Sequence, residues 1–356
     1  MKLAIAGGGT GGHVFPAVAV AREWLRRGPE REVLLIGTER GMEAKLVAEA
    51  GLPFAAIPVA GLKGIGGLRL LRNLALLAPA MVESNSILER QRFAAAFGVG
   101  GYASGPFVLA AALAGVPTVI FEPNAEPGFT NRVLARMANR VATAYETTAA
   151  RLGGRAVVTG IPVRAAFFEI APRPHVPPFR ILITGGSQGS LVVNRAVIDS
   201  LDLLLPRKNQ LFLVHQSGER DYNAVRVAYA RREINAEVVP FISNMAEEFA
   251  RTDLIVCRAG AITAAEVAAA GRAAIFIPFG AATDSHQLRN AQALEAAGAA
   301  RVIPEPQLSP QRLVQEISSL LDQPERMEEM ERHARALARP RAVADIVNLI
   351  EEVARR

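Results

Sequence analysis

Short apolar runs alternate with longer amphipathic segments along the whole chain. The apolar runs are continuous, as expected for strands buried on both faces, and most segments between them have helical spacing. This alternation is typical of parallel sheets with crossover helices, so it predicts an α/β protein. The expected strands cover residues 2–6, 33–36, 94–99, 118–121, 140–144, 180–184, 211–216, 236–241, 254–257 and 274–278.

The pattern also divides into two halves. The sequence GGTGG (residues 8–12) follows the first strand, and GGSQG (residues 185–189) follows the strand at 180–184. Prolines at 172, 174, 177 and 178 mark a linker before that strand. We therefore predict two Rossmann-like, doubly wound domains facing a cleft, at residues 1–163 and 164–340. Residues 341–356 have helical spacing, and this terminal helix can dock on either domain.

Residues 93–121 contain no charged side chain and have the hydropathy of a membrane span. Repeated glycines and prolines argue against one, because a spanning helix must satisfy its own backbone hydrogen bonds. We expect a buried strand, a glycine loop, a helix and a second strand instead.

Composition adds two constraints. The single cysteine, Cys257, excludes a disulfide within the chain and suits a reducing cytosol. Lys and Arg number 40 against 34 Asp and Glu. This excess favours anionic partners such as nucleotide phosphates, acidic lipids or nucleic acid, and serves solubility equally well.

The first glycine loop fits the dinucleotide pattern G-x-G-x-x-G at Gly7, Gly9 and Gly12. A nicotinamide site also needs an acid after the second strand, and Glu39 is a candidate. That reading leaves the second glycine loop unexplained. Two loops between a strand and a helix suit phosphate binding, because glycine lets backbone N–H groups approach an anion.

Polar residues follow several strands, where ligands bind in doubly wound sheets. The pattern allows each of these residues either a functional or a purely structural role. His13 is a base or donor, or a first-turn polar residue. Asn124 either hydrogen-bonds to sugar hydroxyls or forms a turn, and Gln287 either hydrogen-bonds to a sugar or lies on the surface. Ser104 caps a helix that has Pro106 in its first position, and Asp284 caps another.

Thr263 and Glu266 fit a capping box as well as a carboxylate that binds ribose hydroxyls. The chain has no D-x-D, H-x₃-H or H-E-x-x-H pattern, so we expect no metal site.

Residues 50–82 contain no acid. Their basic, leucine-rich and glycine-hinged part is typical of a membrane-surface patch, or of a buried helix whose arginines reach solvent. The residues of the expected patch are Lys63, Leu68, Arg69, Leu71 and Arg72.

Seven motifs then occur in order over nearly the whole chain. They are GGTGGH (8–13), GVGGYASGP (98–106), NAEPGFTNR (124–132), TGIPVR (159–164), GGSQGS (185–190), CRAGAITAAE (257–266) and DSHQLRNA (284–291). Together they closely resemble the MurG family of peptidoglycan N-acetylglucosaminyltransferases, which are family 28 glycosyltransferases. The resemblance implies a GT-B fold whose first domain serves the acceptor and the membrane, and whose second serves the donor.

The implied reaction transfers GlcNAc from UDP-GlcNAc to the C4 hydroxyl of MurNAc in lipid I, with inversion, and gives lipid II. The implied place is the cytoplasmic face of the plasma membrane. The implied partners are an anionic membrane and other cell-wall synthesis proteins, without nucleic acid or cofactor. The last helix is expected to return to the first domain.

The resemblance also assigns roles to residues. Thr10, Gly11 and Gly12 would lie at the donor–acceptor cleft, and Asn124 and Gln287 would meet the GlcNAc. Arg164 and Ser187 would serve the nucleotide-sugar, with Ser187 near the diphosphate. The Ile242 backbone would meet the uracil and Glu266 the ribose, and the nucleoside would be wrapped by Ala261, Ile262, Thr263, Ala264, Ala265 and Glu266.

The chemistry needs a base for the acceptor hydroxyl and stabilisation of the leaving diphosphate. His13 is the first candidate base and Glu122 the second. N–H groups of residues 185–189 would take the place of a metal at the diphosphate. The chain has Phe121-Glu122-Pro123-Asn124 where the family usually has His-Glu-Gln-Asn. Any role of that first histidine therefore does not apply.

Four alternatives remain open at this point. A related transferase would act on another lipid such as diacylglycerol, and a GT-B epimerase would need no lipid. A dehydrogenase would bind NAD(H) instead of UDP. A nucleic-acid-binding protein would bind with a steep salt dependence, although only 6% of the residues are aromatic.

Overall fold

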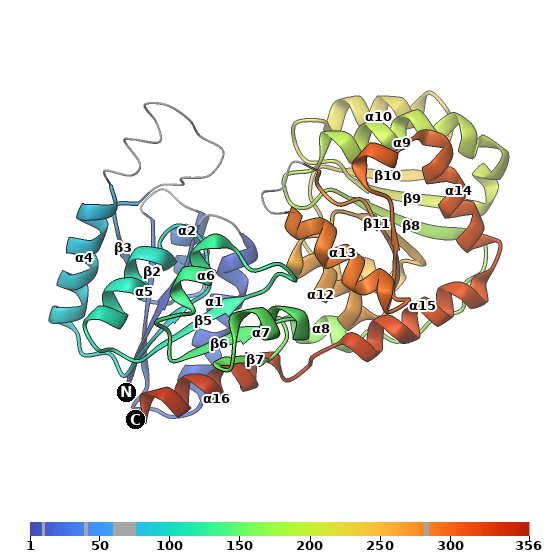
Figure 1. Cartoon of the computed structure of the whole chain (residues 1–356). Coiled ribbons are helices and arrows are strands. Elements are labelled where there is room, and N and C mark those ends of the chain that lie inside the picture. The colour runs from blue at the N-terminus through green and yellow to red at the C-terminus, as the bar shows by residue number, and fades with distance from the viewer. Residues whose placement is uncertain (9–10, 39–41, 60–75, 281–284, 356) are drawn as a thin grey trace. The chain divides into compact units, whose positions relative to one another are not determined.

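A computed structural model describes residues 1–8, 11–38, 42–59, 76–280 and 285–355, and it forms two compact units (Figure 1). The first unit contains Met1–Pro162 together with Arg339–Arg356, and the second contains Val163–Ala338. Each is an α/β unit built on a parallel sheet, as the alternation of apolar and amphipathic segments predicts.

The first unit has a seven-stranded parallel sheet in the order β3-β2-β1-β4-β5-β6-β7. Strand order reverses beside β1, so the loops after β1 and β4 leave the carboxyl edge of the sheet side by side. The strands are β1 Lys2–Ala6, β2 Glu32–Gly37, β3 Phe54–Ala56, β4 Ala95–Gly98, β5 Thr118–Glu122, β6 Arg140–Thr143 and β7 Ala156–Val158. The helices are α1 Gly11–Arg26, α2 Met42–Glu49, α4 Leu77–Arg90, α5 Ser104–Leu113, α6 Phe129–Leu134, α7 Glu146–Leu152 and α16 Ala342–Ala354.

The terminal helix α16 packs on α1 and contacts β4, β5 and β6. Its apolar residues Ile346, Val347 and Ile350 are fully buried, and burial of each side chain stabilises the unit by about 2 kcal/mol. Glu351 accepts from Arg31 at 2.7 Å.

The Arg31 guanidinium also lies 4.5 Å from the ring centroid of the buried Trp24. Trp24 donates its indole N–H to the Glu32 carbonyl at 3.0 Å. The tryptophan and the terminal helix are therefore connected through one arginine.

The second unit has a six-stranded parallel sheet in the order β10-β9-β8-β11-β12-β13. Here β8 pairs with both β9 and β11, so the loops after these three strands are neighbours at the carboxyl edge. The strands are β8 Phe179–Thr184, β9 Leu211–Gln216, β10 Ala236–Val239, β11 Leu254–Cys257, β12 Ala273–Phe276 and β13 Arg301–Val302. The helices are α8 Ala165–Phe168, α9 Leu191–Leu204, α10 Tyr222–Ala230, α11 Met245–Arg251, α12 Ala261–Ala270, α13 His286–Ala296, α14 Pro310–Leu321 and α15 Pro324–Leu337.

All of the predicted strands are present, with ends that differ by two residues at most. The prediction missed β3, β7 and β13, which lie at the edges of the sheets and have three, three and two residues. Residues 93–121 form β4, α5 and β5, as expected. Within the described ranges, no helix combines the length and the hydropathy that crossing a membrane requires.

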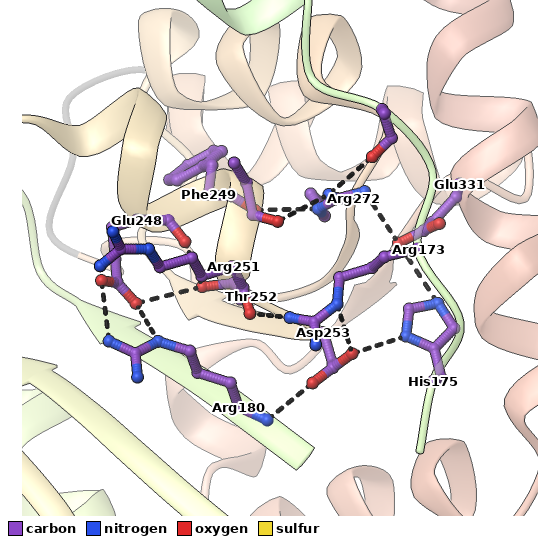
Figure 2. Close-up of polar contacts among 12 residues, drawn as sticks. Arg173, His175, Arg180, Glu248, Phe249, Arg251, Thr252, Asp253, Arg272 and Glu331 are labelled. Atoms are coloured by element: carbon purple, nitrogen blue, oxygen red, sulfur yellow. Dashed lines mark hydrogen bonds and ion pairs between the residues drawn. The ribbon is translucent and has the colours of Figure 1, made fainter. Parts of the chain in front are cut away.

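Charged side chains are buried in the second unit where β8 and β11 begin (Figure 2). His175 donates from Nδ1 to Asp253 at 3.0 Å, and its Nε2 lies 3.4 Å from the Glu331 carboxylate on α15. Asp253 also accepts from the Arg180 backbone N–H at 2.7 Å. Arg272 donates to the carbonyls of Phe249 and Ala171. This network fixes the proline-rich segment onto the base of the sheet.

Burial alone would lower the pKa of His175, but the hydrogen bonds and charges of Asp253 and Glu331 outweigh it and raise the pKa to about 9. The imidazole is therefore a cation in the folded protein at neutral pH, held between two carboxylates.

This network predicts a pH-dependent stability. At neutral pH, His175→Gln lowers the free energy of unfolding by about 3 kcal/mol, because two buried carboxylates lose a cation that they share and each keeps only an arginine at 3.5 or 3.7 Å. Since folding raises the pKa of His175 from 6.5, the contribution is complete below pH 6.5 and is lost as the pH rises through about 9. Urea unfolding of both proteins across this range measures it. A stability difference that stays constant with pH would contradict the assignment.

Candidate functional site

In the first unit, the loops after β1 and β4 touch through their backbones. Gly101 has a φ of +82°, and a Cβ placed on it would lie 1.8 Å from the Gly8 carbonyl oxygen. The ring of His13, in the first turn of α1, lies against Gly100, where a Cβ would be 3.1 Å from Nε2. Gly12 lies in the same turn as His13. The first-turn position of the candidate base is thus confirmed, whereas Thr10 lies outside the described residues and Gly11 is described through its backbone alone.

Glu122 ends β5 and organises the loop that follows it. Its side chain is 2% exposed and accepts hydrogen bonds from four donors. Asn124 donates both its backbone N–H and its side-chain amide to Oε1 at 3.0 Å. The Gly128 N–H and the Asn131 amide reach Oε2 at 2.9 and 3.0 Å. A carboxylate engaged on both oxygens suits a positioning role better than proton abstraction.

Two expectations about α5 are wrong. The helix begins at Ser104 itself, its N-cap is Ala103, and no side chain caps it. Pro106 is therefore the third helical residue rather than the first. The close approach of Ser104 Oγ to Gly98, where a Cβ would be 2.6 Å away, shows that Ser104 packs on β4 instead.

In the second unit, the β8–α9 loop has the form of a phosphate-binding turn. Ser190 is the N-cap of α9 and accepts from the Val193 N–H. Ser187 is exposed at the tip of the loop. Within the described residues, the backbone N–H groups of Ser187 and Gln188 have no hydrogen-bond acceptor. The loop therefore presents free N–H donors beside the N-terminus of a fourteen-residue helix, an arrangement that favours an anion.

Buried side chains hold this loop from behind, and the sequence analysis missed them. Asn194 donates to the Ser217 carbonyl at 2.9 Å, so its Oδ1 accepts from His215 Nε2 at 3.0 Å. His215 Nδ1 then accepts from the Tyr229 hydroxyl at 3.1 Å. Burial lowers the pKa of His215 to about 3, so the ring is neutral as this pattern requires. Gly189, φ +72°, lies so close to the Ser217 carbonyl oxygen that a Cβ would be 1.9 Å away.

A sequence signal for these residues exists. His215 and Gln216 are polar residues at the carboxyl end of an otherwise apolar strand, LFLVHQ. Gln216 donates to the Gly186 carbonyl at 2.8 Å and accepts from the Ile242 N–H at 2.8 Å. Since the Ile242 N–H is engaged, contact of its backbone with a base would use the carbonyl.

The β11–α12 loop adjoins the β8–α9 loop. Arg258 donates to Ser190 Oγ at 3.0 Å and pairs with Glu305 at 2.7 Å. The prediction of a capping box at Thr263 and Glu266 is wrong, because the N-cap of α12 is Gly260 and both residues lie inside the helix. Ala261, Ile262, Thr263, Ala264 and Ala265 form the first helical positions, with Ala264 buried.

Glu266 pairs with Arg164 at 3.1 Å. Burial raises the pKa of the Glu266 carboxyl, and the charge of Arg164 opposes that rise. Burial and the Glu266 charge together raise the pKa of the neighbouring Cys257 thiol. Glu266 is thus partly buried with one cationic partner, and Arg164 is half exposed above it.

Gln287 lies in the first turn of α13 and accepts from the Phe279 N–H at 3.0 Å, so its side chain faces the loop after β12. Asp284 lies outside the described residues, and the N-cap of α13 is Ser285. Glu39 and the expected membrane patch at Lys63, Leu68, Arg69, Leu71 and Arg72 also lie outside them. Among the described residues, no three His, Cys, Asp or Glu side chains are grouped as metal ligands.

Comparison with known proteins agrees with this architecture. Residues 3–143 match the Glycosyltransferase family 28 N-terminal domain and residues 180–347 match its C-terminal domain. These matches define a family 28 glycosyltransferase of GT-B fold.

Full-length relatives narrow the class. The chain is 45% identical over 352 residues to the UDP-N-acetylglucosamine–N-acetylmuramyl-(pentapeptide) pyrophosphoryl-undecaprenol N-acetylglucosamine transferase of Myxococcus xanthus, covering 98% of this chain and 92% of that protein. The protein of the same name from Syntrophus aciditrophicus is 43% identical, with 98% and 97% coverage. The crystal structure of Acinetobacter baumannii MurG is 34% identical with a TM-score of 0.80, covering 99% of both chains. The chain belongs to the MurG family of glycosyltransferases.

More distant structures share the fold alone. The UDP-GlcNAc 2-epimerase of Neisseria meningitidis is 13% identical and has a TM-score of 0.69, with 99% and 100% coverage.

The loop contact in the first unit predicts a sharp glycine requirement. Gly101→Ala forces a Cβ onto the Gly8 carbonyl, whereas Gly115→Ala, at a φ of +76°, meets nothing within 4 Å. Both variants have the strain of a positive φ, about 1 kcal/mol. Gly101→Ala is expected to lower the free energy of unfolding by about 2 kcal/mol more, because the backbone must move. Equal losses in thermal or urea unfolding would contradict this contact.

Proposed function

We propose that this chain transfers GlcNAc from UDP-GlcNAc to the C4 hydroxyl of MurNAc in lipid I, with inversion, and so makes lipid II. The observation that carries the proposal is the phosphate-binding turn before α9, joined through Arg258 to the α12 loop, in a chain whose full-length relatives have this activity in their names. The proposed donor-binding domain is residues 164–340, and the proposed acceptor domain is residues 1–163 with helix 341–356.

The donor site is built from three loops of the second unit. The N–H groups of Ser187 and Gln188 and the dipole of α9 suit the diphosphate. Glu266 suits the ribose hydroxyls, with Arg164 beside it balancing its charge. Ile242 serves the uracil through its carbonyl, and residues 261–265 enclose the nucleoside.

The acceptor site lies in the first unit. His13 is held against Gly100 by the crossing of two loops, and it is the proposed general base for the C4 hydroxyl. Glu122 is proposed as a positioning residue, because its contacts fix the backbone and side chain of Asn124. Asn124 is a proposed contact of the GlcNAc, and Thr10, Gly11 and Gly12 complete the acceptor loop. Gln287, in the second unit, is a further proposed contact of the GlcNAc.

The reaction is a single displacement. The acceptor oxygen bonds to C1 of GlcNAc while the bond from C1 to the diphosphate oxygen breaks, and His13 takes the hydroxyl proton. Charge develops on the leaving UDP, where fixed N–H donors stabilise it without reorganisation.

The first unit also supports a peripheral place at the cytoplasmic face of the plasma membrane. Phe129, Val133 and Met137 are exposed at helical spacing on and after α6, with Phe129 63% exposed. Leu113, 68% exposed, ends the adjoining α5. A cavity of about 480 Å³ opens beside this apolar stripe. Its basic residues are Arg132, Arg136, Arg151 and Arg155. Exposed apolar side chains next to arginines suit an anionic bilayer surface.

Activity is tested by UDP release from UDP-GlcNAc with and without a lipid I analogue, in EDTA. We expect release that depends on the acceptor and needs no divalent metal. Donor binding without release would redirect the search to other lipid acceptors, and absence of donor binding would refute the donor site.

In the same assay, His13→Ala is expected to lower kcat by about 10²- to 10⁴-fold, because the base is lost. His333→Ala, on α15, is the matched control. Near-normal turnover of His13→Ala with an unchanged pH profile would exclude His13 as the base.

Membrane binding is tested by flotation with vesicles of anionic phospholipid. Arg132→Glu/Arg136→Glu should reduce the bound fraction several-fold, and added salt should do the same to the unmodified protein. Arg226→Glu/Arg231→Glu, on α10 and at its C-cap, changes the net charge equally and is the control. Equal losses in both double variants would show an effect of net charge alone and contradict this surface.

A further inference from the structure

One buried amide connects two of the loops assigned to the donor. Gln216, the last residue of β9, is 1% exposed. Its Nε2 donates to the Gly186 carbonyl at 2.8 Å and to Thr184 Oγ1 at 3.1 Å. Its Oε1 accepts from the Ile242 N–H at 2.8 Å. The two ends of the same side chain thus hold the β8–α9 loop and the segment that follows β10.

On the β8–α9 side, both backbone polar groups of Gly186 have hydrogen-bond partners. The Gly186 N–H donates to Thr184 Oγ1 at 3.1 Å, and its carbonyl accepts from the Gly189 N–H at 2.9 Å as well as from Gln216. Both polar groups of the Gly186 backbone are therefore used inside the loop. The free N–H groups of the next two residues, Ser187 and Gln188, are left to face a ligand.

On the other side, Gln216 engages the backbone of Ile242 directly. With the Ile242 N–H bound to Oε1, that peptide unit has a fixed orientation, which also fixes the direction of the Phe241 carbonyl in the same unit. Phe241, just before it, is exposed, whereas the Ile242 side chain packs against the core of the second unit. Beside the pairing of β9 with β10, this amide therefore joins the segment to the β8–α9 loop by direct hydrogen bonds.

We propose that Gln216 is a positioning residue that holds the diphosphate loop and the base-binding segment in a fixed register, and so couples recognition of the base to recognition of the diphosphate. The inference rests on the proposed function, because it takes the donor to be a uridine diphosphate sugar. Gln216 itself does not touch the donor. Its effect is to make a ligand that carries both a base and a diphosphate bind better than either part predicts.

The chemistry of the amide allows the two halves to be separated. Gln216→Glu keeps an acceptor for the Ile242 N–H but replaces the donor to Gly186 with a second acceptor. Gln216→Met has a similar length and removes both contacts. Thr184→Val disturbs only the β8–α9 side. Gln315→Glu, an exposed position on α14, is the control with the same change of charge.

The experiment measures binding of UDP, uridine and inorganic pyrophosphate to each full-length variant, together with KM for UDP-GlcNAc and kcat. Circular dichroism and thermal unfolding establish that each variant is folded. We expect Gln216→Glu and Thr184→Val to weaken UDP and pyrophosphate at least tenfold and to leave uridine within about threefold. Gln216→Met should weaken all three ligands. In folded variants, KM should rise at least tenfold while kcat changes by less than threefold.

Four results would overturn the proposal. One is a Gln216→Met protein with UDP affinity and KM within twofold of the unmodified chain. Another is an equal loss of uridine and UDP binding in both Gln216→Glu and Thr184→Val, which indicates a general structural role. The third is an unmodified chain that binds no UDP, which would overturn the proposed function as well. Normal UDP binding by the unmodified chain and by every variant would overturn the coupling alone.

Discussion

The architecture of both candidate sites depends on backbone touching backbone. At Gly101 and Gly8, and again at Gly189 and Ser217, two loops approach so closely that there is no room for a side chain. These contacts occur where neighbouring strands end, because parallel strands deliver their loops to one edge of the sheet. The glycine-rich sequences are thus needed for two reasons. Glycine lets the loops cross, and it leaves backbone N–H groups accessible to an anion.

Behind these crossings, each unit uses buried polar side chains to fix the loops. Glu122 gathers four donors in the first unit, while Asn194, His215 and Gln216 do the equivalent work in the second. A buried polar group is costly unless it is paired, so each of these side chains has one favourable orientation. That requirement turns a flexible glycine loop into a site with defined geometry, ready before any ligand arrives.

The sequence predicted the α/β fold and the interior strands because continuous apolar runs report burial on both faces directly. It missed the edge strands β3, β7 and β13, whose two or three residues are too short to form such a run. Helix caps failed for a different reason. Ser104 and Thr263 have capping chemistry, but the loops before them enter helical geometry earlier, at positions that tertiary contacts determine. His215 and Gln216 were visible as polar residues in an apolar strand, yet their partners are distant in sequence and known only from the fold.

The only tryptophan of the chain, Trp24, lies wholly in the first unit and touches the arginine that pairs with the terminal helix. The second unit has none. Intrinsic tryptophan emission therefore comes from one half of the molecule alone, and from a ring whose cationic neighbour depends on α16 remaining in place. Undocking of the last helix and unfolding of the first unit are both visible in that emission, whereas events confined to the second unit leave it unchanged.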